Sequence, residues 1–201
     1  MPTPIEFYFD FSSPYSYIAS EQIEDLAARF GRTVHYKPIL LGAVFKVAGS
    51  APLTELYAPK ARYSVRDFAR SAYCASVPYQ QPSRFPIASL AAKRGVVWLQ
   101  QHQPKLAVPF IHAVYRAFFV DDRDISDAAV VGDIAREVGI DPGEFAAGVQ
   151  QLETKERLKS EVDRAIAVGV FGAPAIVVDG ELFWGNDRLP QVEHWLEKGP
   201  F

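Results

Sequence analysis

Cysteine is almost absent from this chain of 201 residues, because Cys74 is the only one. A single thiol excludes an internal disulfide and any zinc site built from several cysteines. We expect Cys74 to be a small buried apolar residue. Histidine is also scarce, and the four histidines show neither close helical pairing nor neighbouring cysteines; they are His35, His102, His112 and His194. The sequence therefore predicts no metal site.

Excess positive charge and long apolar runs are missing as well. The net charge is −3, which gives no general electrostatic attraction for nucleic acid or an anionic membrane. No stretch of about 18 consecutive apolar residues occurs, and the first residues lack a basic segment followed by an apolar one. We therefore expect a cytoplasmic protein with neither nucleic acid nor membrane as a partner. Hydrophobic residues make up 49% of the chain, enough for a substantial core.

The first part of the chain has the pattern of strand, helix and strand. Apolar and polar side chains alternate over residues 5–11 and again over residues 33–37. Between them a helical pattern runs from Pro14 to Phe30 and ends before Gly31. This part is therefore predicted to form a β-α-β unit.

Helical periods dominate the middle of the chain, and strands return near its end. Two short apolar runs, 175–178 and 182–184, are separated by Asp179-Gly180-Glu181. This spacing predicts a hairpin, because Asp-Gly tolerates the positive φ of tight turns. A terminal helix is expected to run to about Glu197.

This order of elements matches an α/β, thioredoxin-like fold with a large all-helical insertion. We expect the thioredoxin-like domain to be discontinuous, formed by residues 1–56 and 169–201. Residues 57–168 are expected to form the helical insertion domain.

A strand-to-helix elbow at Ser12-Ser13-Pro14-Tyr15-Ser16 is the most informative segment. Serine as N-cap and proline at the first helical position fit this geometry. Ser13 then lies beside free backbone N–H groups at the positive end of the helix dipole, where an anion is stabilised. The segment alone leaves two functions open for Ser13. It caps the helix, or it stabilises a thiolate that arrives with a cofactor.

Three separated motifs carry a resemblance to a known family. They are FYFDFSSPYSY at residues 7–17, VFGAPA at 170–175 and WGNDRL at 184–189. With these motifs in this order, the chain resembles the 2-hydroxychromene-2-carboxylate isomerases and the kappa-class glutathione transferases. These proteins are thioredoxin-like relatives of the DsbA-type oxidoreductases, and the similarity covers nearly the whole chain.

The resemblance implies a role for five residues. Ser13 would be the catalytic serine, whose hydroxyl donates a hydrogen bond to the glutathione sulfur and holds it as a thiolate. Pro174 would be a cis-proline opposite the elbow, and the backbone of Ala173 would pair with the cysteinyl residue of glutathione. Asn186 and Asp187 would bind the γ-glutamyl end. From the residues alone, Pro174 could also start a strand, and Asn186 or Asp187 could cap the terminal helix.

The implied activity is a glutathione-dependent isomerisation in aromatic catabolism, with a small aromatic carboxylate as substrate and a homodimer as the assembly. Thiolate addition to a cis double bond makes it single, rotation follows, and elimination gives the trans product. Two alternatives remain open. They are a kappa-type glutathione transferase or peroxidase acting on another electrophile, and a non-catalytic glutathione-binding module. Disulfide exchange is excluded at the elbow, where Ser13 and Ser16 stand in place of the redox Cys-x-x-Cys.

The substrate side has fewer signals. Cations and aromatic residues suited to an aromatic carboxylate occur in the segment expected to cover the site, although a solvated helical face explains most of them equally well. They are Phe45, Lys46, Tyr57, Lys60, Arg62, Tyr63 and Arg70. Ser50 and Ala88 stand where the family pattern has asparagine, so neither position is assigned a role.

Overall fold

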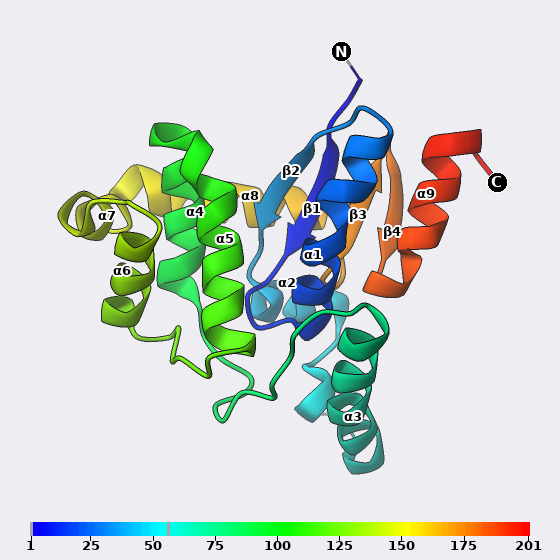
Figure 1. Ribbon diagram of the computed structural model, residues 1–201, viewed down its shortest axis with the longest axis horizontal. Coiled ribbons are helices and arrows are strands. Elements are labelled where there is room, and N and C mark those ends of the chain that lie inside the picture. The colour runs from blue at the N-terminus through cyan, green and yellow to red at the C-terminus, as the bar shows by residue number, and fades with distance from the viewer. Residues whose placement is uncertain (1, 56) are drawn as a thin grey trace.

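A four-stranded mixed sheet forms the centre of the thioredoxin-like part in the computed structural model, which describes residues 2–55 and 57–201 (Figure 1). The strand order is β2-β1-β3-β4, with bounds Ile5–Phe9 for β1, Val34–Pro38 for β2, Ala175–Val178 for β3 and Glu181–Trp184 for β4. β1 pairs in parallel with β2 and antiparallel with β3, and β3 pairs antiparallel with β4. The expected hairpin is confirmed, since Asp179 and Gly180 have φ of 52° and 94°.

Helices fill the chain between β2 and β3, as the sequence predicts. The α-helices are α1 (Pro14–Arg29), α2 (Leu41–Ala48), α3 (Ala58–Cys74), α4 (Leu90–His102), α5 (Pro104–Phe119), α6 (Ala128–Glu137), α7 (Pro142–Gly148), α8 (Leu152–Ala167) and α9 (Leu189–Lys198), and the short 3-10 helices are η1 (Leu53–Glu55) and η2 (Asn186–Arg188). Met1 and Leu56, the ends of the predicted segment 1–56, lie outside the described residues. The two predicted domain boundaries stay predictions.

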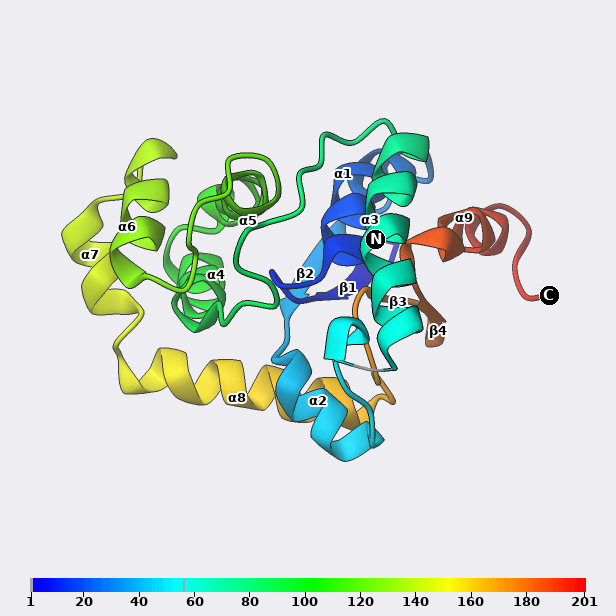
Figure 2. The same ribbon diagram turned by 90° about the horizontal axis from the view of Figure 1, so that it is seen from below.

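The two faces of the sheet pack against different helices. Figure 2 shows α1 on one side of the sheet and α2 with α8 on the other. Successive side chains of a strand point to opposite faces, so Phe7 and Phe9 join the larger core with α1, α4 and α5. Tyr8 joins a smaller core with Val44 of α2 and Ala165 of α8. Burial on both faces explains why β1 is apolar at nearly every position.

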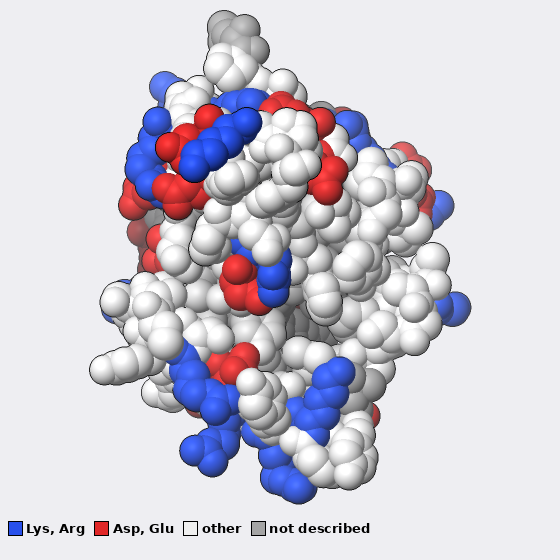
Figure 3. Space-filling view, turned by 90° about the vertical axis from the view of Figure 1, so that its right-hand side faces the viewer, with Lys and Arg blue, Asp and Glu red and all other residues white. Residues whose placement is uncertain are grey.

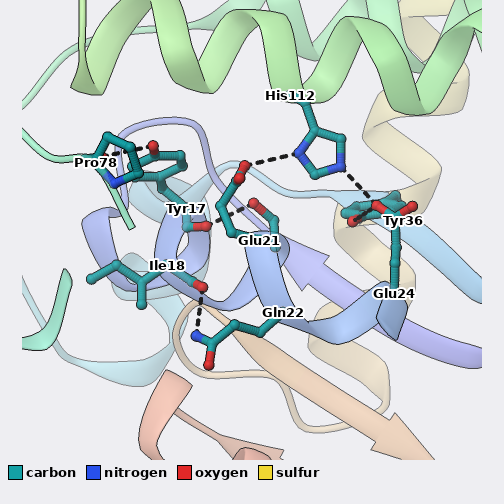
Figure 4. Close-up of polar contacts among 9 residues, drawn as sticks. Tyr17, Ile18, Glu21, Gln22, Glu24, Tyr36, Pro78 and His112 are labelled. Carbon is teal, nitrogen blue, oxygen red and sulfur yellow. Dashed lines mark hydrogen bonds and ion pairs between the residues drawn. The ribbon is translucent and has the colours of Figure 1, made fainter. Parts of the chain in front are cut away.

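A charged cluster ties α1 to α5 (Figure 4). His112 of α5 lies between two glutamates of α1, with its Nδ1 3.0 Å from Glu21 Oε1 and its Nε2 2.7 Å from Glu24 Oε1. Tyr36 of β2 donates a hydrogen bond to the same Glu24 oxygen at 2.7 Å. Burial alone would lower the pKa of His112, but the hydrogen bonds to both glutamates outweigh it and raise this pKa to about 9.

The prediction that Cys74 is buried is wrong. Cys74 ends α3 with its side chain exposed. The buried stripe of α3 consists of Ser64, Phe68 and Ala72 at helical spacing. Cys74 lies two positions past the last of these, about 200° around the helix axis, so it is off the buried stripe and borders a surface groove between α3 and α1.

The described residues, 2–55 and 57–201, contain neither a membrane-spanning helix nor a cluster of metal-binding side chains. No described helix is long and apolar enough to cross a membrane. Within the same ranges, no group of three or more His, Cys, Asp or Glu side chains is placed to hold a metal ion.

Candidate functional site

The elbow at the end of β1 has the geometry that its sequence predicts. Ser13 is the N-cap of α1, with extended φ and ψ of −100° and 111°, and Pro14 follows in the first turn. The Ser16 backbone N–H donates to Ser13 Oγ at 3.1 Å. Ser13 is 5% exposed. The hydroxyl therefore caps the helix and also lies at its positive end.

The first two motifs meet at Ser13. Its hydroxyl donates a hydrogen bond to the Ala173 carbonyl oxygen at 2.9 Å. The Ala173–Pro174 peptide bond is cis, as the resemblance implies. The pairing of Tyr8 with Ala175 across β1 and β3 places the two segments side by side.

The third motif completes the same site from β4. Gly185 N–H donates to the Pro174 carbonyl oxygen at 3.0 Å. Gly185 has φ of 116°, and a Cβ there would lie 2.4 Å from an oxygen of Asp187. Only glycine therefore fits at 185 with Asp187 in this position.

Asn186 and Asp187 form η2, and the alternative that they cap the terminal helix is wrong. The N-cap of α9 is Arg188, and neither η2 nor α9 has a side-chain cap hydrogen bond. The Asp187 carboxylate instead pairs with the Arg188 guanidinium at 2.5 Å, and its side chain is 62% exposed. The carboxylate is therefore accessible at the surface of the site and carries Arg188 as its partner.

One cavity of about 1580 Å³ contains all five residues assigned by resemblance: Ser13, Ala173, Pro174, Asn186 and Asp187 line it. It lies between the elbow, α2, α3 and the loop after β4. On the face in Figure 3, a hollow opens in the surface, and Lys and Arg side chains gather below it at the level of α3.

Part of the suspected substrate side lines this cavity. Its members there are Phe45, Lys60 and Tyr63, together with Ser50 and Ala88. The remaining suspected residues, Lys46, Tyr57, Arg62 and Arg70, are not among the lining residues. The solvated-face interpretation is therefore favoured for Lys46, Tyr57, Arg62 and Arg70.

A buried ion pair beneath the elbow was missed by sequence reasoning. Lys93 Nζ of α4 lies 2.6 Å from Asp10 Oδ2, and both residues are under 5% exposed. Asp10 also accepts from Ser12 N–H at 2.9 Å and from Leu41 N–H at 3.0 Å, which joins the elbow to the start of α2. The available signal was a lysine among the mostly apolar residues 90–99, which also include Arg94.

Two further contacts attach the cover of the cavity to the elbow. Tyr15 donates to Asp67 of α3 at 2.6 Å. Burial, and then this hydrogen bond, raise the pKa of Tyr15, so its hydroxyl remains protonated. Ser12 Oγ accepts from Ile87 N–H at 3.0 Å, beside a second cis peptide bond at Phe85–Pro86.

Two aromatic residues, Phe171 and Trp184, form an aromatic wall of the cavity next to the cis-proline segment. Phe171 and Trp184 have ring centroids 5.0 Å apart. A Cβ at Gly172 would lie 2.5 Å from Trp184 Nε1, so glycine is needed there for the indole to pack on the backbone. The wall is half exposed, with Phe171 at 44% and Trp184 at 53%.

The chain is similar over nearly its whole length to known proteins. The profile of the DsbA-like thioredoxin domain matches residues 4–197. The 2-hydroxychromene-2-carboxylate isomerase of Sphingobium xenophagum is 32% identical over 197 residues, covering 98% of this chain and 99% of that protein. Glutathione S-transferase kappa 2 of Caenorhabditis elegans is 26% identical, covering 98% and 94%. The structure of a 2-hydroxychromene-2-carboxylate isomerase superposes with a TM-score of 0.86 at 26% identity, covering 96% of this chain and 94% of that one.

Proposed function

This chain belongs to the family of DsbA-like thioredoxin domains, and because it is similar to a 2-hydroxychromene-2-carboxylate isomerase over nearly its whole length, we propose that it is a glutathione-dependent isomerase. Its reaction interconverts 2-hydroxychromene-2-carboxylate and trans-o-hydroxybenzylidenepyruvate. The observation that carries this proposal is the position of Ser13. Its hydroxyl lies at the N-terminus of α1 and against the Ala173 carbonyl, where a redox member of the fold would carry a cysteine.

The residues present fit glutathione. A thiolate needs hydrogen-bond donors and positive potential, which the Ser13 hydroxyl and the N-terminus of α1 supply. The ammonium of the γ-glutamyl end needs an acidic partner, and Asp187 lines the same cavity. The cavity of about 1580 Å³ also exceeds the range of roughly 300–1000 Å³ usual for one small ligand. It has room for a tripeptide and a small acid together.

Glutathione held by these residues would supply a thiolate nucleophile for reversible addition to the conjugated double bond, which permits rotation about that bond. Ser13 must lower the pKa of that thiol. A free thiol with pKa near 8.5 is only about 3% ionised at pH 7, and lowering its pKa by two units requires about 2.7 kcal/mol. One charge-assisted hydrogen bond and a helix N-terminus together provide a stabilisation of this size.

The Ser13 hydroxyl must turn to perform this role. It now donates to Ala173 O, and a hydroxyl has a single proton to donate. Donation to the thiolate therefore releases the Ala173 carbonyl, which is then free to accept the cysteinyl N–H of glutathione. Ser13 Oγ keeps accepting from Ser16 N–H throughout, so the elbow keeps its cap.

The test is to incubate the purified protein with 2-hydroxychromene-2-carboxylate, with and without sub-stoichiometric glutathione. Approach to isomer equilibrium is followed while the remaining free thiol is titrated. We expect equilibration that depends on glutathione and consumes no thiol. Absence of equilibration despite glutathione binding would overturn the proposed activity.

A kappa-type glutathione transferase is the second candidate, supported by the 26% identity to a kappa enzyme over nearly the whole chain. It differs in consuming glutathione, so the thiol titration separates the two. Binding without turnover on a panel of electrophiles and peroxides would indicate a non-catalytic glutathione-binding module. We also propose that the protein is cytoplasmic and that it forms a homodimer. Sedimentation of the purified protein tests the homodimer.

A further inference from the structure

Two buried polar side chains at the start of α4 have no place in the chemistry proposed for Ser13. Ser89 and Lys93 lie one helical turn apart, with the Lys93 N–H bonded to the Ser89 carbonyl oxygen at 3.1 Å. Both line the cavity that contains Ser13. Ser89 is 1% exposed and Lys93 is 4% exposed.

Ser89 occupies the N-cap position of α4, but its hydroxyl does not cap the helix. A serine at this position ordinarily accepts a hydrogen bond from a backbone N–H of the first turn, but Ser89 makes no side-chain cap hydrogen bond. Its buried Oγ has no hydrogen-bond partner among the described residues. Burying a hydroxyl without a partner is unfavourable. A ligand acceptor in the cavity would remove this cost.

The Lys93 ammonium has N–H donors that make no hydrogen bond to the described residues. An ammonium group has three, and the one hydrogen bond that it makes within the described residues goes to Asp10. Asp10 already accepts two backbone N–H groups. Lys93 lines the cavity, so a ligand there can supply a second acceptor.

The other cations on the cavity wall are placed differently. Arg188 is paired with Asp187, and Lys60 is exposed on α3. Lys93 is the buried one of these three, and α4 has 13 residues, so its dipole adds positive potential beside the ammonium. Burial strengthens the interaction of this ammonium with an anion relative to that of an exposed lysine, and the paired Asp10 carboxylate offsets part of it.

We infer that Ser89, Lys93 and the first-turn N–H groups of α4 form a carboxylate-binding subsite. Lys93 is linked to the elbow through Asp10, whose carbonyl oxygen accepts from Ser13 N–H at 2.9 Å. A carboxylate bound here lies in the same cavity as the thiolate position. The identity of its owner rests on the proposed function: it belongs to the small aromatic acid that is isomerised, or to the glycine end of glutathione.

The first test uses trans-cinnamate, an aromatic carboxylate without a thiol, and its neutral analogue cinnamamide, with affinities measured by calorimetry on the full chain. We expect Ser89→Ala to weaken cinnamate binding about tenfold and to leave cinnamamide binding unchanged. The matched control is Ser64→Ala, because buried Ser64 lines the same cavity but its hydroxyl already donates to Lys60 O at 2.9 Å. Thermal stability of Ser89→Ala should equal or exceed that of the parent.

A second arm identifies the owner of the carboxylate. If glutathione provides it, Ser89→Ala weakens binding of glutathione and leaves that of its glycine ethyl ester unchanged, while cinnamate is unaffected. If Ser89→Ala binds cinnamate as tightly as the parent does, and also binds glutathione as tightly, the subsite is overturned.

Lys93 is tested in a charge-neutral background, since Lys93→Met alone would leave Asp10 buried without its partner. The double variant Asp10→Asn with Lys93→Met should weaken binding of the same carboxylate further than Ser89→Ala does. Asp10→Asn alone leaves the Lys93 charge without its carboxylate partner, so it should lower thermal stability but bind the ligand carboxylate no less tightly than the parent does. If the variants bind cinnamate and glutathione as the parent does, and the parent shows glutathione-dependent turnover, the subsite is overturned but the proposed activity is not. Ser89-dependent cinnamate binding without such turnover overturns the proposed activity only.

Discussion

Ser13 and Ala173 are 160 positions apart in sequence, yet the Ser13 hydroxyl donates a hydrogen bond to the Ala173 carbonyl oxygen at 2.9 Å. This bond joins the elbow after β1 to the cis-proline segment before β3. It also occupies the two groups that the proposed chemistry requires for glutathione. The free protein thus satisfies internally the donor and the acceptor that the ligand would use.

Ser13→Ala should retain the fold and lose most of the activity. The variant removes the donor to the thiolate, and we expect turnover to fall on the order of 10-fold, because the helix N-terminus still lowers the thiol pKa in part. Loss of the cap should lower the free energy of unfolding by about 1 kcal/mol. Thiolate absorbance against pH should show a raised pKa for bound glutathione.

The control is Ser20→Ala in the same helix. Ser20 is buried, and its hydroxyl donates to the Tyr17 carbonyl within α1. A comparable loss of turnover in Ser20→Ala, or full turnover in Ser13→Ala, would remove the role assigned to Ser13.

Asp187→Asn should weaken glutathione binding with little change in turnover at saturation. The carboxylate faces an ammonium in the proposed complex, and its exposure of 62% limits the effect to about tenfold or less. A glutathione analogue without the γ-glutamyl amine should bind the parent and the variant equally. If the affinities of the variant for glutathione and for the analogue fall by the same factor, Asp187 does not contact the amine.

The His112 cluster should make stability depend on pH in the alkaline range. The folded-state pKa of His112 is raised to about 9 by Glu21 and Glu24, against about 6.5 in the unfolded chain. The stabilisation is therefore complete below about pH 6.5 and is lost as pH rises through 9. Because the glutamates are partly exposed, we expect on the order of 2 kcal/mol.

Urea unfolding at pH 6 and pH 9.5 measures this effect. The parent should lose more free energy of unfolding between the two pH values than His112→Gln does. Parallel losses in the two proteins would show that the cluster contributes nothing to this dependence.

Cys74→Ser should leave isomerase turnover unchanged. The thiol is exposed at the end of α3 and has no role in the proposed chemistry. Alkylating the parent with iodoacetamide before the assay should likewise leave turnover intact. A large loss in a folded Cys74→Ser protein would return disulfide chemistry to consideration.

Local patterns predicted the frame of the site well. The Ser-Pro start of α1 and the Asp179-Gly180 turn each depend on backbone preferences within a few residues, and the structure has both. The cis state of Pro174 followed from the family resemblance, because the sequence alone does not determine the isomer.

Contacts between distant segments could not be predicted in this way. The Asp10–Lys93 pair joins residues 83 positions apart, and only the packing of α4 against the elbow brings them together. Cys74 was placed in the core from residue type, whereas its angular position on α3 decides its exposure. Asn186 and Asp187 do not cap the terminal helix, because they belong to a separate 3-10 turn that precedes it.

The pairing of β1 with β3 has a consequence for how the protein is made on the ribosome. Ile176 of β3 pairs with Phe7 of β1, and β4 follows later still. At roughly 5–20 residues per second, the elbow waits on the order of ten seconds or more for the strand that completes its cavity. The nascent polypeptide therefore gains its binding pocket only after every helix from α2 to α8 has been synthesised.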